Sequence, residues 1–321
     1  MSIITQLHKK DFIKILEYYD IGRYSSHKHI PWALSNTVYI LQTTKRRFVL
    51  KIFETPDLDF IKFQIKIMQL IEKEGLPSPR IIYTRQGAPL LIFNNKILLI
   101  QEFVKGREPK KFNDELIIDI AIKQARMNNI LRRIKTRKKY GWEKDYQFKP
   151  INTRIQKYRD FNIKLENNKF IKELRENIKK KKLRVSVIHG DFHGANLLVE
   201  KNKLKAILDW DDAHKDFIAQ EIATFIAHTF IEEKTIEIEK LKLYLNTYEK
   251  LLKLNREERK AIYFFIKHRF LSAITWHIDQ LKKHRDRSRN IERFINRTIK
   301  KYRNFDKFPL GEFIHLFENV D

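Results

Sequence analysis

The residues best suited to chemistry lie in one continuous segment, residues 185–213, with the sequence VSVIHGDFHGANLLVEKNKLKAILDWDDA. Asp191 stands in a polar loop with two glycines, Asn196 follows five residues later, and Asp209 follows Asp191 by eighteen residues. A loop aspartate can orient and deprotonate a hydroxyl group, while an asparagine and a second aspartate can hold Mg²⁺ on nucleotide phosphates. The spacing therefore predicts a phosphoryl-transfer centre in which Asp191 is the base and Asn196 and Asp209 bind the metal.

Short strands must position these three residues. The β-branched run at 185–188 predicts a strand that ends at the loop, and the segments 197–200 and 204–208 predict a hairpin across the polar residues 201–203. Each residue alone is weak evidence, because an aspartate in a glycine-containing loop is commonly a turn former. The combination satisfies several independent constraints at once, which favours the kinase interpretation.

Five polar neighbours have supporting roles in this interpretation. His189 is expected to brace the loop through hydrogen bonds, whereas His193 faces either the phosphates or the solvent. Asp211 and Asp212 either add negative potential at the metal site or cap a helix expected over 217–230, which is the more usual role for acids in such a place. Glu221 is expected to link that helix to the loop.

The first hundred residues alternate between helical and strand patterns. Apolar spacing predicts helices over 9–19 and 57–74, and strands around 29–34, 37–41, 48–53, 89–93 and 96–103. Asn94 and Asn95 tolerate the positive φ of a tight hairpin. Beyond Gly106 the pattern is almost wholly helical, with Asn113 as a helix cap and Asn255 and Glu258 as a capping pair.

One lysine of the strand-rich part is a candidate phosphate ligand. Lys51 lies between apolar residues in FVLKIFE, where a long cationic side chain can reach the α- and β-phosphates. In a chain with 66 Lys and Arg, a solvent-facing lysine is the alternative. The order of Ser35 and Asn36 followed one hairpin later by Lys51 favours the functional role, because it resembles the nucleotide loop and phosphate-binding lysine of a known kinase superfamily. Ser35 and Asn36 themselves either donate hydrogen bonds to phosphate oxygens or simply form a turn.

Together these motifs resemble the aminoglycoside phosphotransferase and choline kinase superfamily, small-molecule kinases with the protein-kinase fold, and most closely the type II homoserine kinases. The likeness covers most of residues 15–280, with specific motifs at 35–51 and 189–212. It implies an α+β, bilobal protein-kinase-like fold, with a nucleotide-binding lobe over 1–103 and a mainly α-helical catalytic and substrate-binding lobe over 104–321. It also implies ATP and Mg²⁺ as cofactors, and Gln101 and Phe103 as further nucleotide contacts.

The chain departs from this family's pattern at two points. Ala33 and Leu34 stand where relatives often have a pair of glycines, so a close approach of the backbone to phosphate is not guaranteed. Gln64 stands where relatives carry the helix glutamate that pairs with the lysine. A glutamine can hydrogen-bond Lys51 but cannot neutralise it, which predicts weakened catalysis.

The composition limits the remaining possibilities. The 321 residues carry a formal charge of +26 and no cysteine, which excludes disulfides and thiolate sites. No apolar run is long enough for a membrane span and the first residues lack a signal peptide, so the cytoplasm is the expected location. The basic clusters at 132–139, 179–182 and 284–289 are dispersed, which favours solvated helix faces over a nucleic-acid stripe.

The sequence thus predicts an ATP- and Mg²⁺-dependent kinase that phosphorylates a hydroxyl group of a small metabolite by direct in-line transfer. Homoserine or a similar amino alcohol is the leading acceptor. Trp276, His277 and Asp279 either line its pocket or belong to the core. An aminoglycoside kinase is the second possibility, and a nucleotide-binding pseudokinase or basic scaffold is the third. The acceptor, the choice between ATP and GTP, and the oligomeric state stay open.

Overall fold

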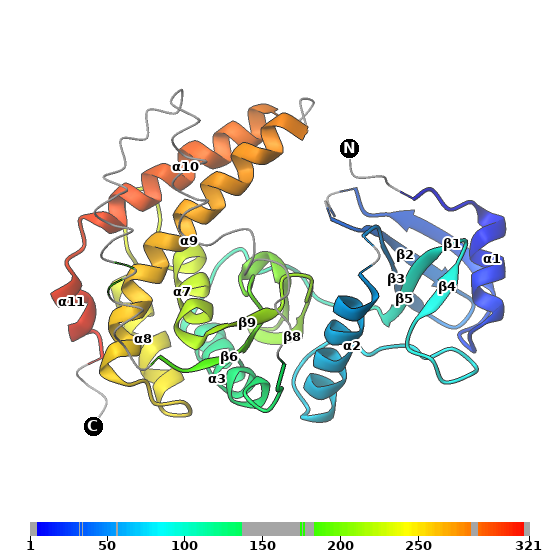
Figure 1. Ribbon diagram of the computed structural model, residues 1–321, viewed down its shortest axis with the longest axis horizontal. Helices are drawn as coiled ribbons and strands as arrows, with labels where there is room; N and C mark the ends of the chain where they lie inside the picture. Colours follow the sequence, from blue (N-terminus) through cyan, green and yellow to red (C-terminus); the bar gives the residue numbers. More distant parts are fainter. Residues whose placement is uncertain are drawn as a thin grey trace. The chain divides into compact units, whose positions relative to one another are not determined.

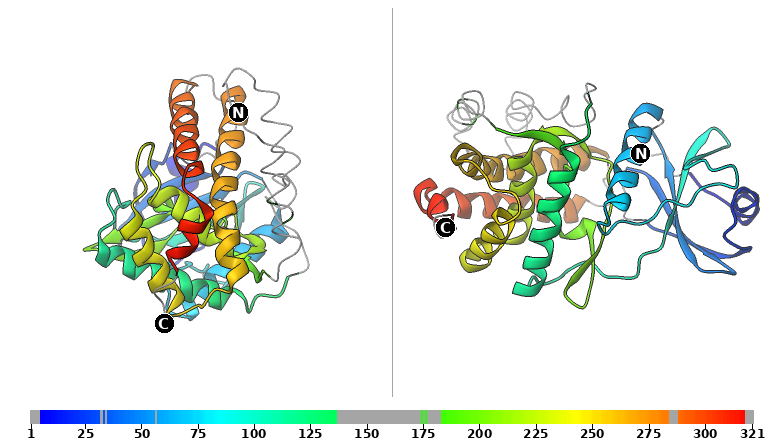
Figure 2. Two further views of the ribbon diagram at one scale, coloured as in Figure 1. Left: turned by 90° about the vertical axis from the view of Figure 1, so that its left-hand side faces the viewer. Right: turned by 90° about the horizontal axis from the view of Figure 1, so that it is seen from below.

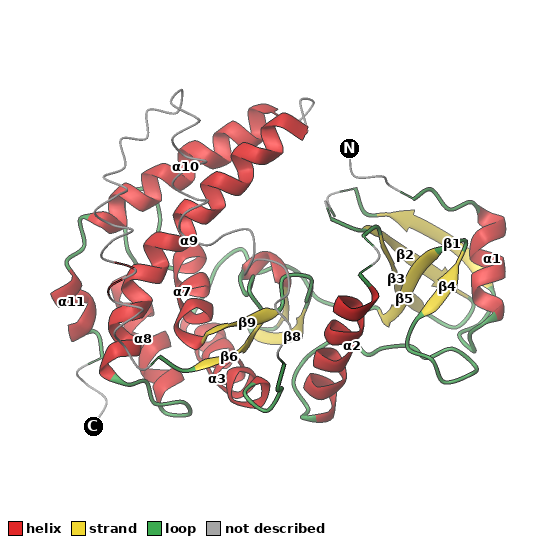
Figure 3. Cartoon of the chain, viewed as in Figure 1, coloured by secondary structure: helices red, strands yellow, loops and turns green. Residues whose placement is uncertain are grey.

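The computed structural model describes residues 5–31, 33, 35–55, 57–136, 174, 176, 183–283 and 288–317. Leu34, the basic cluster at 179–182, and parts of the clusters at 132–139 and 284–289 lie outside these residues. The chain divides into two compact units, and each is described by itself. The first comprises Met1–Gly106 and Lys205–Leu208, and the second comprises Arg107–Leu204 and Asp209–Asp321. Strands dominate the first unit and helices the second (Figure 3).

The first unit is built on a five-stranded antiparallel sheet with the order β1-β2-β3-β5-β4. Its strands are β1 (Tyr24–His29), β2 (Thr37–Thr43), β3 (Arg47–Phe53), β4 (Leu91–Phe93) and β5 (Lys96–Glu102). Two helices, α1 (Lys9–Glu17) and α2 (Leu58–Lys73), lie on opposite faces of this sheet (Figure 1).

Side-chain alternation along β3 explains this layering. Phe48, Leu50 and Ile52 belong to the buried cluster that also holds Phe12 of α1. Because successive side chains of a strand point to opposite faces, Val49, Lys51 and Phe53 lie on the face that carries α2. The face toward α1 is thus fully buried along β3, whereas Val49 and Lys51 on the other face are half-buried.

The turn predicted at Asn94 and Asn95 is present, whereas the strand predicted around 29–34 lies elsewhere in the chain. Asn94 and Asn95 have φ of 49° and 59°, the left-handed conformation expected for this hairpin. The strand expected around 29–34 is instead β1 at Tyr24–His29. Its sequence YSSHKH is polar, but its pairing with β2 and the stacking of His27 on Phe12, at 4.1 Å between ring centroids, hold it in place. Tertiary packing, which the local pattern does not reveal, decided this strand.

The second unit is mainly a helical assembly. Helices α7 (Ile218–Thr229) and α10 (Ser288–Asp306) both pack on α9 (Arg256–Lys283), and α3 (Asp114–Leu131) packs on α8 (Ile238–Glu249). The long pair α9 and α10 runs side by side in both views of Figure 2 and buries Ile274, Ile278, Ile295 and Ile299. Among the described residues, no helix is long and apolar enough to cross a bilayer. The short helix α11 (Leu310–His315) follows.

Two of the predicted helix caps in this unit, at Asn113 and Asn255, are present, and the cap predicted for α7 is absent. The Asn113 Oδ1 atom accepts from the Leu116 N–H at 3.1 Å, and Asn255 Oδ1 accepts from the Glu258 N–H at 2.9 Å. The idea that Asp211 or Asp212 caps the helix at 217–230 is wrong. The N-cap of α7 is Phe217, without a side-chain cap, because strand β9 (His214–Phe217) lies between the two acids and the helix.

Candidate active site

The central loop is fixed at both ends by strands. Strand β6 (Val185–Ile188) pairs with β9, with Ile188 opposite His214, and the loop leaves β6 at His189. Gly190 has φ of 83°, and a Cβ atom there would lie 2.3 Å from the Asp212 carbonyl oxygen. Because a side chain cannot fit, this position requires glycine. The loop therefore turns directly against the backbone of the acidic segment that follows Asp209.

Glu221 connects α7 to this loop. Its Oε1 accepts from the His189 N–H at 2.8 Å, and its Oε2 accepts from the Gly190 N–H at 3.1 Å. The carboxyl group is fully buried, and this burial raises the pKa of Glu221 to about 7 even though the two N–H donors act in the opposite direction. The carboxylate satisfies two backbone donors that would otherwise be unpaired, so it fixes the path of the loop into Asp191.

Asp191 is the most densely coordinated group of the site. Its Oδ2 accepts from Asn196 Nδ2 at 2.9 Å and contacts His193 Nε2 at 3.2 Å, and its Oδ1 accepts from Arg269 Nη2 of α9. The side chain is nevertheless 25% exposed. A carboxylate offers about four acceptor positions, so a position on Oδ1 is available for an incoming hydroxyl group.

The charges around Asp191 set its protonation state. Burial alone would raise the pKa of Asp191, but the Arg269 guanidinium, followed by His193, outweighs it and holds this pKa well below the usual range. Asp191 is therefore ionised throughout the physiological range. It can accept a hydrogen bond from an acceptor hydroxyl and orient the oxygen, which is the contribution that a loose phosphoryl-transfer transition state requires.

Two stacked histidines flank the carboxylate. The rings of His193 and His228 are parallel, with their centroids 4.4 Å apart. His193 Nδ1 accepts from the Ala195 N–H, which assigns the proton to Nε2, the atom that faces Asp191. His228 Nε2 accepts from Arg269 Nε at 3.1 Å, and burial, with nearby positive charge, lowers the pKa of His228 well below its usual value. His228 is thus a neutral support for Arg269.

The two candidate metal ligands lie at the same end of one hairpin. Strands β7 (Leu197–Glu200) and β8 (Lys203–Ile207) pair across a turn with positive φ at 201 and 202, so Asn196 precedes β7 where Asp209 follows β8. Among the described residues the side-chain bonds of Asn196 use Nδ2, which leaves Oδ1 for a cation. Asp209 is exposed and has φ of 58°.

This donor set fits Mg²⁺ bound together with a nucleotide. The described residues contain no cluster of three His, Cys, Asp or Glu side chains that could enclose a metal. Mg²⁺ at nucleotide sites commonly has one or two protein ligands and takes the others from phosphates and water. Asn196 and Asp209 match that requirement, and no closed protein cage is needed.

In the first unit, Lys51 lies on the α2 face of the sheet, opposite Val38 and Leu99 in register. Its Nζ atom lies 5.2 Å from the centroid of the Phe53 ring. Gln64 is buried on α2, and Met68, one turn later on that helix, accepts a 3.5 Å contact from Gln101 Nε2. The predicted phosphate lysine and the predicted helix partner therefore belong to the same side of the sheet.

The segment at 35–36 is tied to the end of β3. Asn36 Oδ1 accepts from the Glu54 N–H at 3.1 Å, and Ser35 is exposed. The carboxylate of Glu54 accepts from Lys96 Nζ at 2.7 Å and from the Thr37 hydroxyl. These bonds give the turn at 35–36 a fixed position. Phe103, the last predicted nucleotide contact, packs under the Arg47 guanidinium, 4.2 Å from the ring centroid.

Several residues of the site have no local sequence signal. Arg269 and His228 lie on two different helices and reach Asp191 only through the packing of α7 on α9. Glu54 and Lys96 meet only because β3 and β5 are neighbours. A spacing argument along α9 would have placed Arg269, Trp276 and His277 on one face, but it would not have shown that this face meets the loop.

Comparison with known proteins agrees with this geometry. Residues 26–254 match the phosphotransferase enzyme family. The chain belongs to this family. The homoserine kinase of Bradyrhizobium diazoefficiens is 25% identical to the phosphotransferase over 272 residues, which cover 82% of this chain and 81% of that kinase. The homoserine kinase of Zymomonas mobilis is 23% identical over 290 residues, 86% of this chain and 89% of that kinase.

Solved structures support the fold of the phosphotransferase. Amicoumacin kinase hAmiN, in complex with AMP-PNP, Ca²⁺ and Ami, matches with a TM-score of 0.74 and 16% identity over 95% of both chains. A microcompartment-associated aminopropanol kinase matches with a TM-score of 0.66 and 14% identity over 94% of this chain and 98% of that one. The predicted α+β kinase-like fold, with a β-sheet N-terminal part and a helical C-terminal part, is confirmed. The roles assigned to the lobes at 1–103 and 104–321 stay predictions.

Proposed function

We propose that this phosphotransferase transfers the γ-phosphoryl group of ATP to the hydroxyl group of a small amino alcohol or hydroxy amino acid, with homoserine as the leading candidate. The observation that carries the proposal is the Asp191 carboxylate, which is ionised, fixed by three side chains and still partly exposed. Such a group can orient a hydroxyl oxygen for in-line attack on a phosphorus atom.

The other residues have complementary roles in the proposal. Asn196 and Asp209 would hold Mg²⁺, which supplies neutralising charge on the nucleotide phosphates. Lys51 steadies the α- and β-phosphates, and the turn at 35–36 offers donors to phosphate oxygens. Glu221 keeps the loop backbone in position, so that the orientation of Asp191 does not depend on the substrate. Gln101 and Phe103 are the proposed contacts for the rest of the nucleotide.

The homoserine kinases among the relatives support a small acceptor, and the aminopropanol kinase among the structural neighbours supports an amino alcohol. The aminoglycoside phosphotransferase of Alicyclobacillus acidocaldarius shares the fold, which makes an aminoglycoside-type acceptor the second candidate. The charge of +26 disfavours a polycation, because such an acceptor would be repelled unless its pocket were locally acidic.

The test is steady-state turnover of purified protein with Mg·ATP and a panel of acceptors: homoserine, serine, threonine, 3-amino-1-propanol, ethanolamine and two aminoglycosides. ADP release is followed by a coupled assay and the product by ³¹P NMR. We expect phosphorylation of at least one small acceptor at physiological salt. Nucleotide binding without turnover of any acceptor would favour a pseudokinase. Sub-micromolar RNA binding at physiological salt together with absent turnover would favour a basic scaffold.

A further inference from the structure

Arg269 occupies a position in the site that neither metal binding nor phosphate binding explains. Its Nε donates to the neutral His228 ring and its Nη2 donates to Asp191. These two donors belong to one edge of the planar guanidinium, so both contacts fix the plane and the direction of the group. The side chain is 15% exposed, which leaves it within reach of a small molecule.

The adjacent Nη1/Nη2 edge of the same guanidinium is suited to a ligand. Among the described residues, the recorded bonds of Arg269 use Nε and Nη2, so the Nη1/Nη2 edge still has N–H groups to offer. Two parallel N–H groups on such an edge match the two oxygens of a carboxylate. The group is therefore preorganised for an anionic partner, and no rotation is needed before it binds.

The surface next to Arg269 is the half-exposed face of α9. Arg269, Ala273, Trp276, His277 and Gln280 follow helical spacing and are all partly accessible, whereas Phe270, Ile274 and Ile278 between them are buried. His277 donates to the Ala273 carbonyl, and burial lowers the pKa of His277 to about 4. At neutral pH the residues named here place the Arg269 guanidinium near an indole and an uncharged histidine, whose ring stacks on Phe294 of α10 at 3.9 Å between centroids.

We propose that Arg269 determines acceptor specificity by binding a carboxylate of the acceptor while Asp191 holds the acceptor's hydroxyl group. This inference rests on the proposed function and narrows it to hydroxy amino acids. Because Arg269 and Asp191 are in direct contact, a ligand that reaches both must carry its carboxylate and hydroxyl groups only a few carbons apart. An amino alcohol without a carboxylate would leave the Nη1/Nη2 edge of Arg269 without a partner.

Three matched pairs of acceptors isolate this contact: L-homoserine and 3-amino-1-propanol, L-serine and ethanolamine, and L-threonine and 1-amino-2-propanol. Within each pair the second compound lacks only the carboxylate. We expect wild-type protein to prefer the carboxylate-bearing member. Arg269→Gln should raise the KM of that member by roughly 10- to 100-fold, the range for a lost charge-assisted pair, and leave the KM of the decarboxylated member within about threefold.

Two further variants complete the design. Arg269→Lys keeps the positive charge but lacks the two parallel N–H donors of a guanidinium, and it should recover part of the affinity that Arg269→Gln loses. Arg297→Gln removes a positive charge from an exposed site on α10 that pairs with Glu232, so it controls for net charge and should leave both KM values unchanged. Acceptor binding is also measured by thermal shift with saturating Mg·AMP-PNP, where only carboxylate-bearing compounds should raise Tm, and only with Arg269 present.

The outcomes separate the inference from the proposed function. Equal losses for both members of a pair in Arg269→Gln, or a wild-type preference for the decarboxylated member, would overturn the specificity role and leave the kinase proposal standing. Turnover of carboxylate-free acceptors alone would overturn only the inference, and turnover of no member of any pair would overturn both.

Discussion

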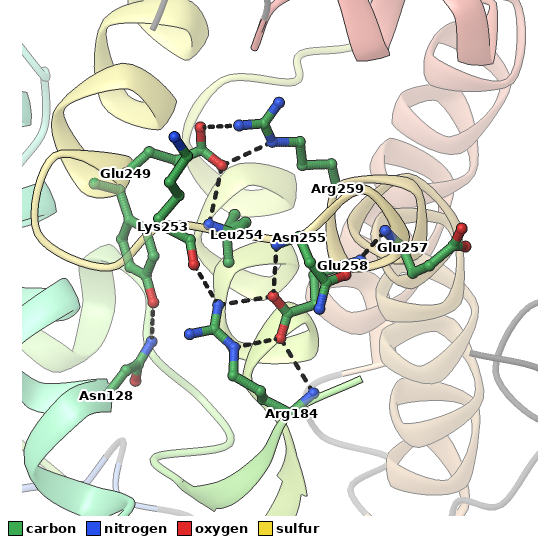
Figure 4. Close-up of polar contacts among 10 residues, drawn as sticks. Asn128, Arg184, Glu249, Lys253, Leu254, Asn255, Glu257, Glu258 and Arg259 are labelled. Atoms are coloured by element: carbon green, nitrogen blue, oxygen red, sulfur yellow. Dashed lines mark hydrogen bonds and ion pairs between the residues drawn. The ribbon is translucent and has the colours of Figure 1, made fainter. Parts of the chain in front are cut away.

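Two arginine–carboxylate pairs in the second unit, Glu258 with Arg184 and Asp191 with Arg269, have the same chemistry but differ in their exposure to solvent. Glu258 accepts two bonds from the Arg184 guanidinium, each 2.7 Å long, and two more from the Arg184 and Asn255 N–H groups (Figure 4). Its side chain is 1% exposed. The neighbouring pair of Glu249 and Arg259 is also bidentate.

The pair of Asp191 and Arg269 is built differently. Arg269 gives one donor to Asp191 and another to His228, and the carboxylate is 25% exposed. In the Glu258 cluster every acceptor position has a donor, so a substrate has nothing to bind. At Asp191 the arginine only partly saturates the carboxylate. The comparison teaches that incomplete pairing within reach of solvent distinguishes a carboxylate that can still accept a ligand from a structural one.

The largest expected effect is on turnover at Asp191. Asp191→Asn keeps the shape of the side chain but removes the charge that orients and accepts the hydroxyl proton, so kcat should fall by about 10²- to 10⁴-fold while nucleotide affinity stays nearly unchanged. Steady-state kinetics and calorimetry with ATP measure both. Asp306→Asn, at an exposed pair with Lys267, is the control and should leave kcat unchanged. Wild-type turnover in Asp191→Asn would remove Asp191 from the mechanism.

The second prediction concerns stability at the closed pair. Arg184→Met leaves the buried Glu258 charge without its guanidinium partner, which should lower the free energy of unfolding by about 3 kcal/mol. Arg269→Met should lower it by less than Arg184→Met does, because Asp191 keeps Asn196 and His193 as partners and stays partly exposed. Urea unfolding of both variants checks the difference. Equal losses would mean that the two pairs do not differ as described.

The third prediction uses the raised pKa of Glu221. Burial raises the pKa of Glu221 from its ordinary value of 4.5 to about 7, so between these pH values the folded state holds a proton that the unfolded state has lost. Glu221 therefore contributes on the order of 2 to 3 kcal/mol to the free energy of unfolding below pH 4.5, and this contribution is lost as the pH rises to 7. Glu221→Gln does not titrate, so it should lack this decline.

Urea unfolding at several pH values between 4.5 and 8 gives the two stability curves. Glu312→Gln, an exposed acid on α11, serves as the control and should follow the wild-type curve. Parallel curves for wild type and Glu221→Gln would show that the Glu221 carboxyl group does not titrate in this window.

The smallest effect is expected at the metal. Asp209→Ala removes the charged ligand and leaves Asn196, a neutral one, so the gain in ATP affinity on adding Mg²⁺ should shrink by about tenfold or more. Calorimetry with and without Mg²⁺ measures this gain. Lys215→Ala, at an exposed position on β9, is the control. An unchanged Mg²⁺ effect would move the metal to Asp211 or Asp212, and the Asp212 carbonyl lies against the Gly190 turn.

Local patterns in the sequence predicted much of this molecule. The hairpin after Asn196, the turn at Asn94 and Asn95, and the caps at Asn113 and Asn255 all depend on residues a few positions apart, and the structure contains them. The loop at 189–196 was located for the same reason, since its residues are consecutive. The strand expected at 29–34 was misplaced because β1 depends on contacts with β2 and α1.

What the sequence determined by itself is the set of candidate residues: an aspartate, an asparagine and a second aspartate at fixed spacing, the last two at one end of a hairpin. What only the tertiary structure decided is the charge state and the surroundings of Asp191. Arg269 lies 78 residues away, and His228 reaches the site through the packing of α7 on α9. Electrostatic effects depend on distance in space and on burial, and the spacing of residues along a chain specifies neither.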